Sequence, residues 1–371
     1  MPAARTVGSA PSHDGPTTTA TQPDRPPVGP DEGPDSPTDL AGSSWWAAVR
    51  RTVREFTADA IPDLAAGLTY YGVLSIFPGL LVLVSVVGLL GDGATDDVQA
   101  VIGDIAPGEI GGFLDQAIVQ VRDSGGTAGL VAILGLLTAF WSASSYIGAF
   151  MRAANAIYDV PEGRPIWKTL PIRLGVTAVI GLMLIASALI VVFTGELAAQ
   201  AGELIGAGPA AVATWDVAKW PVLVVLVSLM FSILYWATPN ARHGGFRWVS
   251  PGSVLAVLLW LAVSAAFAFY VANFASYNET YGAIAGVVVF LVWLWLTNIA
   301  ILLGGELDAE LERGRAISAG HPADGEPYLE LRDSSKVPEH RRPADAGVLA
   351  RRQPADSPSA AGASSRGADR T

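Results

Sequence analysis

Six long stretches of this chain contain no Asp, Glu, Lys, Arg or His, and this feature restricts its folding more than any other. They lie at residues 64–91, 128–151, 174–195, 220–238, 250–274 and 283–305. A hydrocarbon core of about 30 Å is crossed by about 20 apolar residues in a helix. Because the backbone must satisfy its own hydrogen bonds in lipid, such a stretch is expected to be helical. The pattern predicts an all-α polytopic membrane protein with six transmembrane helices.

The composition agrees with a chain that lies mostly in lipid. Charged residues make up 15% of the 371 residues, whereas a soluble domain carries about 25%. The absence of cysteine excludes disulfides, iron–sulfur clusters, thiolate zinc sites and a thiol nucleophile. The formal net charge is −11, and no basic stripe of the kind that binds nucleic acid is visible. We therefore expect the lipid bilayer, and no nucleic acid, as a partner.

The two ends of the chain differ in composition from the middle. Residues 1–43 and 316–371 are rich in small and polar residues and in proline, and they hold too little apolar surface to offset the entropy of ordering. We predict a disordered tail at each end and a six-helix transmembrane domain over 44–315. Since residues 1–43 lack an apolar segment of the signal-peptide type, the first membrane helix is expected to be an uncleaved targeting signal.

Basic residues alternate between the connecting segments. The segments that hold them are 44–63, 152–173, 239–247 and the chain after 306. The other three connections each hold one Lys or Arg or none. Because cytoplasmic loops carry the Lys/Arg excess, both termini are predicted to be cytoplasmic. The Arg-, Ala- and Gly-rich composition indicates a GC-rich bacterial genome, and hence a bacterial cytoplasmic membrane as the location.

Two segments outside the six stretches show helical periodicity. In the outer connection 92–127, apolar residues recur at helical spacing on both sides of Pro107, which predicts two short amphipathic helices. Segment 44–60 carries aromatic residues such as Trp45 and Trp46 among arginines, which favours a helix lying at the membrane interface. The alternative is a cytosolic extension of the first membrane helix.

Polar residues within the apolar stretches gather on three of the predicted helices. The candidates for a substrate path are Thr69, Tyr70, Tyr71, Ser75 and Pro78 on the first helix, Ser142 and Ser145 on the second, and Asn298 on the sixth. Pro78 has no backbone donor, so we expect a kink or break near Leu74 and Ser75. A second interpretation is that these side chains only hydrogen-bond between helices, at about 0.6 kcal/mol each.

A second candidate group lies at the predicted cytoplasmic rim. Its members are Arg152, Asn155, Arg173, Arg242 and Glu306. A ring of arginines with Glu306 as partner is suited to holding an anionic headgroup. The alternative is that the arginines are orientation signals whose side chains extend to the interface.

We expect no enzymatic activity, no cofactor and no metal site. The four histidines, at positions 13, 243, 321 and 340, show no metal-ligand spacing, and no phosphate-binding P-loop is present. No ionisable residue other than tyrosine falls within the six stretches, so a proton relay through the membrane centre is not expected.

Several motifs, in chain order, resemble the YihY/BrkB family. They are Ala66-Gly67-Leu68-Thr69-Tyr70-Tyr71, Ser75-Ile76-Phe77-Pro78, Trp141-Ser142-Ala143-Ser144, Asn155-Ala156-Ile157-Tyr158, Arg164-Pro165-Ile166-Trp167-Lys168, Tyr235 to Pro239, Tyr281-Gly282, Trp293-Leu294-Trp295 and Gly304 to Glu310. The resemblance covers about residues 44–312. Two positions depart from it, because the family's usual Gly-Ala-Glu is Gly304-Gly305-Glu306 here and a usual Asn is Asp308.

The resemblance implies a six-span inner-membrane protein. Some members carried the label ribonuclease BN, which is widely regarded as a misassignment, and others are linked to serum resistance or to export of lipidic envelope precursors. Two functions remain open for this chain. One is a permease or flippase-like exporter of an amphipathic or anionic envelope-related molecule, with a lipidic or anionic small molecule as partner. The other is a non-transporting membrane scaffold or envelope-integrity factor.

Overall fold

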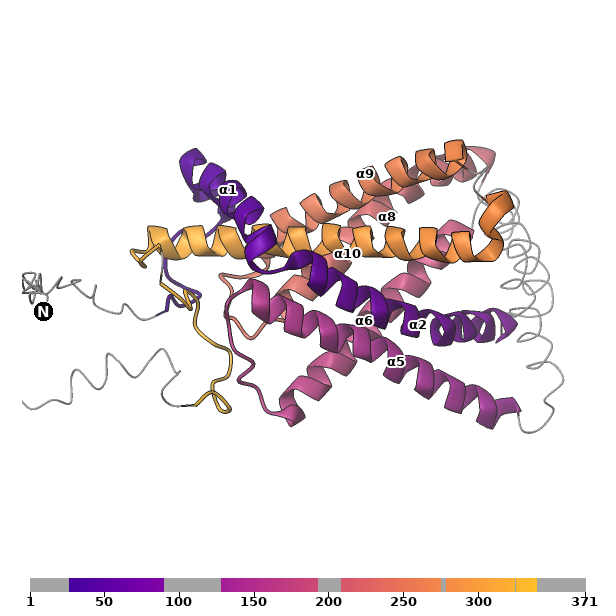
Figure 1. The fold of residues 1–371 in the computed structure, drawn as a ribbon, viewed down its shortest axis with the longest axis horizontal. Coiled ribbons are helices and arrows are strands. Elements are labelled where there is room, and N and C mark those ends of the chain that lie inside the picture. Colours follow the sequence, from indigo (N-terminus) through magenta and orange to yellow (C-terminus); the bar gives the residue numbers. More distant parts are fainter. Residues whose placement is uncertain (1–26, 90–127, 193–207, 275–277, 324, 339–371) are drawn as a thin grey trace, which may run out of the picture.

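The computed structural model describes residues 27–89, 128–192, 208–274, 278–323 and 325–338, and these are mainly helical (Figure 1). The α-helices are α1 (Gly42–Ala58), α2 (Ile61–Leu89), α5 (Ala128–Ile157), α6 (Ile166–Val192), α8 (Pro209–Ala237), α9 (Ser250–Phe274) and α10 (Asn278–Ser318). Two short 3-10 helices are η1 (Pro37–Asp39) and η3 (Phe246–Val249). The described residues form no strand beyond two isolated β-bridges. The predicted all-α class is confirmed.

As far as the structure describes them, the six predicted stretches fall in the six long helices α2, α5, α6, α8, α9 and α10, with only Thr238 outside. Among the described residues, four helical segments are long and apolar enough to cross a membrane: Ile166–Val191, Pro209–Ala237, Phe246–Val271 and Gly286–Ser318. Helix α10 continues well past the predicted end at residue 305 because its last turns pack against protein. The amphipathic pair predicted within 92–127 lies outside the described residues.

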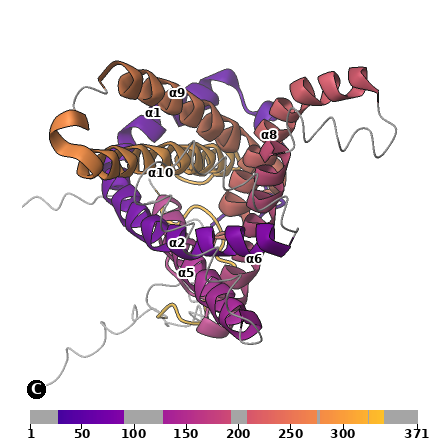
Figure 2. The same cartoon turned by 90° about the vertical axis from the view of Figure 1, so that its right-hand side faces the viewer.

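The six long helices form a closed ring. Going round it, α2 contacts α5, α5 contacts α6, α6 contacts α8, α8 contacts α9, α9 contacts α10, and α10 returns to α2 (Figure 2). Successive helices run in opposite directions (Figure 1). The connections 158–165 and 238–249, helix α1 and the described ends of the chain therefore lie at one end of the ring.

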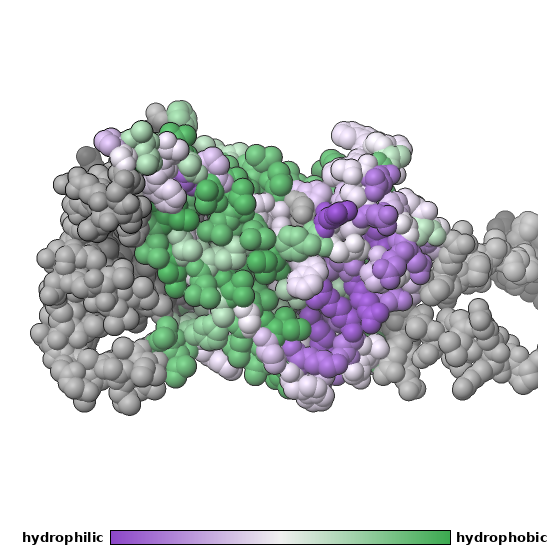
Figure 3. Space-filling view, turned by 180° about the vertical axis from the view of Figure 1, so that it is seen from behind, coloured by the Kyte–Doolittle hydropathy of each residue, from purple (hydrophilic) through white to green (hydrophobic). Residues whose placement is uncertain are grey.

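That end is packed, whereas the side chains become more exposed towards the other end. On α8, Met230, Leu234 and Tyr235 are buried, while Val217 and Trp220, nearer its start, are exposed. The surface of the packed end is hydrophilic, and a broad apolar surface covers the helices next to it (Figure 3). Since exposed apolar surface of this size marks a membrane or protein contact, it fits helices that face lipid.

The packed end contains a close backbone crossing between α9 and α10. A Cβ atom built on Gly252 would lie 2.0 Å from the carbonyl oxygen of Gly304, and one on Gly304 would lie 2.4 Å from that of Gly252. Gly305 differs, because its Cβ would meet Tyr235 at 3.4 Å, an ordinary contact. Asp308 completes the crossing by accepting a hydrogen bond of 2.6 Å from the Gly252 N–H. Gly252 lies in the first turn of α9, where unpaired N–H groups favour a carboxylate.

Both predicted tails are too long at their inner ends. Val28, Tyr328 and Leu329 are buried, and Val28 forms a β-bridge with Leu329. Residues 319–323 and 325–338, which we call the C-terminal strap, cross the packed end and hydrogen-bond to both of its connections. Composition missed this segment because a few apolar anchors and many backbone hydrogen bonds order it. Residues 1–26 and 339–371 lie outside the described part.

Helix α1 is a separate helix rather than an extension of α2. The two are divided at Asp59 and Ala60, where Ala60 adopts a left-handed φ of 50°. One face of α1 packs on α10, and Arg51 pairs with Glu310 there. The opposite side leaves Trp46 and Val53 exposed, as an interfacial helix would.

Candidate functional site

The polar residues of the predicted substrate path are bonded mainly to one another. Asn298 on α10 is buried; its Nδ2 donates to Thr69 Oγ1 at 3.1 Å, and its Oδ1 accepts from the Tyr146 hydroxyl at 2.8 Å. This chain joins α2, α5 and α10. Tyr70 lies apart from it with 61% of its surface exposed. A substrate reaching Asn298 or Thr69 would have to replace these hydrogen bonds.

The backbone around Pro78 is accommodated by the neighbouring helix. Because proline has no N–H, the Leu74 carbonyl loses its helical donor. The Ser142 hydroxyl on α5 donates to that carbonyl at 2.9 Å. The Ser75 hydroxyl is shared between the Tyr71 carbonyl of its own helix at 2.8 Å and the Ser142 carbonyl at 3.1 Å. Helix α2 continues through this point to Leu89. The predicted break is therefore absent, and these serines link α2 to α5.

A different arrangement lies where α5 meets α6. The Arg173 guanidinium donates to the hydroxyls of Ser144 and Ser145, at 2.7 and 3.0 Å from Nη2. Its Cζ lies 5.4 Å from the centre of the Trp141 ring, a distance at which a cation is attracted to the aromatic face. Trp141 is itself 58% exposed. Arg173 thus reaches inward along α5 rather than out to the rim.

Arg152 lies on the same face of α5. Its Nη1 donates to the Gly148 carbonyl at 3.0 Å, and its Cζ is 5.7 Å from the centre of the Tyr71 ring. Gly148 lies next to both arginines. Its carbonyl accepts from Arg152, and a Cβ atom built at this position would lie 3.3 Å from Arg173 Nη1. Within the described part of the chain, neither Arg152 nor Arg173 has a carboxylate partner.

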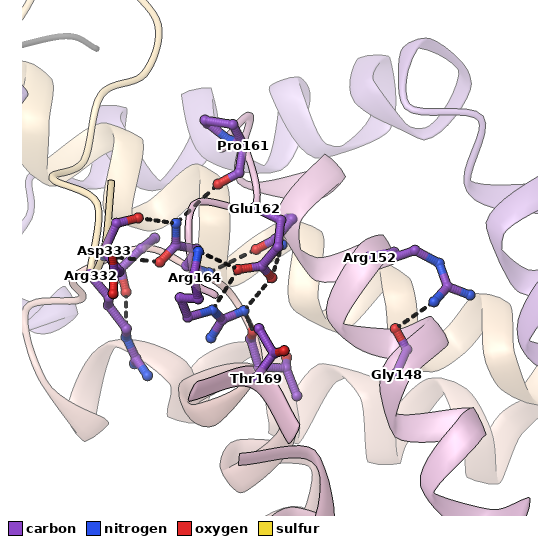
Figure 4. A network of polar contacts seen from close by, with 12 residues as sticks. Gly148, Arg152, Pro161, Glu162, Arg164, Thr169, Arg332 and Asp333 are labelled. Atoms are coloured by element: carbon purple, nitrogen blue, oxygen red, sulfur yellow. Dashed lines mark hydrogen bonds and ion pairs between the residues drawn. The ribbon is translucent and has the colours of Figure 1, made fainter. Parts of the chain in front are cut away.

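A separate polar network around Glu162, Arg164 and Asp333 lies at the packed end (Figure 4), and Asn155 belongs to it through Glu162. Its Nδ2 donates to Glu162 at 2.9 Å, and its Oδ1 accepts from the Asn240 N–H at 2.7 Å. Glu162 also holds Arg164, which is buried. The Asn240 side chain then bonds to Asp333 of the C-terminal strap. Arg152 lies away from this network in Figure 4, so these two predicted rim residues do not share a site.

Asp333 closes the network from the strap side. It pairs with Lys168. The hydrogen bond from Lys168 is the main reason that the pKa of the Asp333 carboxyl lies below its usual range, and the hydrogen bonds from Ser335 contribute less. Arg242, another predicted rim residue, pairs instead with Glu330 on the strap at 3.1 Å. The strap thus takes up two of the basic side chains at this end.

Glu306 has a carboxyl neighbour rather than an arginine. It is buried and lies close to the Asp59 carboxyl, so a negative charge on one of the two groups disfavours ionisation of the other. Burial raises the pKa of Asp59 to about 6. No ion pair joins Glu306 to an arginine among the described residues, so the predicted arginine ring around it does not form there.

The acidic residues that follow Glu306 on α10 are buried structural partners. Asp308 binds the start of α9, and Glu310 pairs with Arg51 and Arg313. Glu312 accepts from the Gly244 N–H at 2.8 Å and from Arg315 Nε at 2.6 Å. Sequence reasoning missed these roles because Arg51, Gly244 and Gly252 come from distant segments, although Arg313 and Arg315 lie only three residues from their partners on α10. No group of three potential metal ligands lies together in the described ranges.

The fold and these polar contacts define a polytopic α-helical membrane protein with a polar cap at one end. The chain belongs to the family described as Virulence factor BrkB, whose profile matches residues 52–326. This supports the resemblance to YihY/BrkB proteins.

Among its relatives is the ribonuclease-like protein YfkH of Bacillus subtilis, 33% identical over 258 residues, which cover 70% of this chain and 92% of that protein. A UPF0761 membrane protein of Pseudoalteromonas atlantica is 29% identical over 71% of this chain and 85% of its own length. Another, from Mannheimia succiniciproducens, is 25% identical over 71% of this chain and 89% of its own. No solved structure matches.

Proposed function

We propose that this protein is a permease or flippase-like exporter in the bacterial cytoplasmic membrane that moves an amphipathic anionic molecule of the cell envelope. The observation that carries the proposal is the position of the Arg173 guanidinium, which lies against Ser144, Ser145 and Trp141. Trp141 is ten residues inside the end of the predicted span 128–151, about 15 Å along a helix. If the predicted span is right, the proposal puts a permanent positive charge within the apolar layer.

A charge at this depth is expensive, and intramembrane ionisable groups usually mark a ligand or ion pathway. Two serine hydroxyls and an aromatic face reduce the cost for Arg173 but do not neutralise it. An anionic headgroup would supply the missing negative charge. The exposed apolar side chains of the same helices, such as Leu137 on α5 and Leu182 on α6, would accommodate its apolar part.

The proposal includes six membrane crossings with both termini in the cytoplasm. In its support, the basic connections 152–173 and 239–247 belong to the end of the ring that also carries α1 and the C-terminal strap. Reporter fusions after residues 110 and 160 test the orientation. Opposite-side signals are expected, with residue 160 cytoplasmic, and same-side signals would overturn the topology.

Transport is tested by flux in proteoliposomes made with envelope lipids extracted from a deletion strain. Arg173→Gln should abolish most of the flux, and Arg173→Lys should retain part of it because the charge remains. Arg247→Gln is the matched control, since Arg247 is an exposed arginine on η3. Equal flux with wild type and Arg173→Gln, at equal reconstitution, would contradict the proposal.

A second candidate function is a membrane scaffold, and the exposed side of α1 favours it. Trp46 and Val53 are 64% and 71% exposed there, and such residues also suit a protein contact. If Trp46→Ser disturbs the cell envelope while flux in proteoliposomes is unchanged, the scaffold function is the better account. The word ribonuclease belongs to the name of the Bacillus relative, and we propose no catalysis for this chain.

A further inference from the structure

We infer that Arg152 and Arg173 together bind a phosphate-bearing headgroup on the face of α5 that is turned towards α6. The inference deepens the proposed function and rests on it for the view that the ligand is the transported molecule. Binding itself is a separate property and can be measured separately.

The site is built on one stripe of α5. Leu137, Trp141, Ser145, Gly148 and Arg152 follow one another at intervals of four, four, three and four residues, which places them on one side of a helix. The Arg173 side chain reaches this stripe from α6 and is held by Ser145 and by the buried Ser144. Leu137, Trp141 and Arg152 are exposed, so the stripe is accessible.

The two arginines keep several N–H groups free for a ligand. Arg173 uses Nε and Nη2 on the serine hydroxyls, and no described residue accepts from its Nη1. Arg152 uses Nη1 on the Gly148 carbonyl, and its Nε and Nη2 have no acceptor among the described residues. Two guanidinium groups with free N–H donors match the several oxygens of a phosphate.

Charge balance points to the same ligand class. Several other arginines near the packed end are paired with carboxylates: Arg51 with Glu310, Arg164 with Glu162, and Arg315 with Glu312. Arg332 has no carboxylate but donates to two backbone carbonyls. Arg152 and Arg173 instead lie on either side of Gly148, and their like charges repel. A dianionic phosphate would neutralise both, whereas a carboxylate would neutralise one.

The surroundings indicate an amphipathic phosphate. The Trp141 and Tyr71 rings lie beside the two guanidinium groups at 5.4 and 5.7 Å, which orients the cations and leaves less room for water. From Trp141 the stripe continues to Leu137, 60% exposed. A headgroup at the arginines would therefore place an acyl or prenyl chain along Trp141 and Leu137.

The test is calorimetric titration of the full chain in a neutral detergent with four probes. They are dihexanoyl phosphatidic acid, dihexanoyl phosphatidylcholine, inorganic phosphate and hexanoate. The phosphatidic acid is expected to bind most tightly. Arg173→Gln and Arg152→Gln should each weaken it about tenfold, the value of one charge-assisted hydrogen bond, and Arg247→Gln should leave it unchanged.

The outcomes separate the alternatives. Inorganic phosphate binding as tightly as phosphatidic acid would keep the phosphate site and make free phosphate its ligand. Hexanoate binding equally well, or undiminished binding in both arginine variants, would overturn the inference. Thermal melting identifies a variant that fails to fold; Arg152→Gln removes only one hydrogen bond to protein and so keeps the test valid if Arg173→Gln unfolds.

Binding and transport can also fail independently. If an arginine variant loses phosphatidic acid binding but keeps its flux, the binding site is supported and the transport proposal is contradicted. Loss of flux in Arg173→Gln with unchanged binding would contradict the site and leave transport standing.

Discussion

The Ser142 hydroxyl donates a hydrogen bond of 2.9 Å to the Leu74 carbonyl oxygen, the group that Pro78 leaves without a helical donor. A residue on α5 thus replaces a hydrogen bond that α2 cannot make for itself. This relationship explains how a proline can lie inside a continuous helix between Ile61 and Leu89, as is tolerated in membranes when a neighbouring helix supplies the partner.

Ser142→Ala should lower the free energy of unfolding by about 0.5–1.5 kcal/mol, because the Leu74 carbonyl then has no partner. Pro78→Ala restores the helical N–H, so the double variant should lose less stability than Ser142→Ala alone. Unfolding in detergent micelles measures the coupling. Ser187→Ala is the control, since the Ser187 hydroxyl bonds only within its own helix. Simple additivity of the two changes would refute the assignment.

Gly252→Ala should prevent correct packing of α9 on α10. The added Cβ would lie 2.0 Å from the Gly304 carbonyl oxygen, and a backbone atom cannot move aside cheaply, so the cost should be about 3 kcal/mol or more. Gly181→Ala meets nothing within 4 Å and should be neutral or slightly stabilising. Yield of monodisperse protein and melting temperature measure both. A well-folded Gly252→Ala protein would show that the crossing is looser than described.

Ending the chain after Gly325 should destabilise the protein strongly, whereas ending it after Pro338 should not. The shorter chain loses the buried Tyr328 and Leu329 and the Asp333 contacts with Asn240 and Lys168. Asn240→Ala should reproduce part of this loss, about 2–4 kcal/mol, because it removes three hydrogen bonds at a buried position. The melting temperatures of the two truncated chains and of Asn240→Ala test this prediction. Similar melting temperatures for the two truncated chains would contradict a structural role for the strap.

Stability should fall as the pH drops below about 6.5, in part through His243. Burial, with the charges of Arg332 and Arg315, lowers the pKa of His243 to about 3, while the unfolded chain has a pKa near 6.5. Between these values the unfolded chain binds a proton that the folded protein does not, so stability rises with pH there. The nearest carboxylate, Glu312, lies 3.9 Å away and does not reverse the shift.

His243→Phe should therefore reduce the acid sensitivity between about pH 6.5 and 3, by up to about 1.4 kcal/mol per pH unit. The variant keeps a planar aromatic ring, although a larger one, so the edge contact with Tyr158 can persist. Unfolding free energies of wild type and variant at pH 7.5, 5.5 and 4.5 test this, and the difference removes the contribution of the carboxylates common to both. Parallel pH curves would contradict the buried neutral histidine.

The sequence by itself determined the helices and their class. Apolar stretches without charge have one stable structure in lipid, and their positions therefore agree with α2, α5, α6, α8, α9 and α10. The alternation of Arg-rich connections likewise predicted which ends of the helices lie together. These features are local in the chain or repeat along it, so composition and periodicity are sufficient to find them.

Only the tertiary structure decided where the polar and charged groups act, because that depends on which distant segments meet. The six stretches are free of charge in sequence, yet Arg173, in the second turn of α6 and just outside the predicted span 174–195, has its side chain against Trp141, well inside the predicted span of α5. Glu306 lies beside Asp59 rather than an arginine, and the tail-like residues 327–333 close the packed end. A side chain reaches several ångströms from its own backbone, so an uncharged stretch of sequence does not guarantee an uncharged place in the fold.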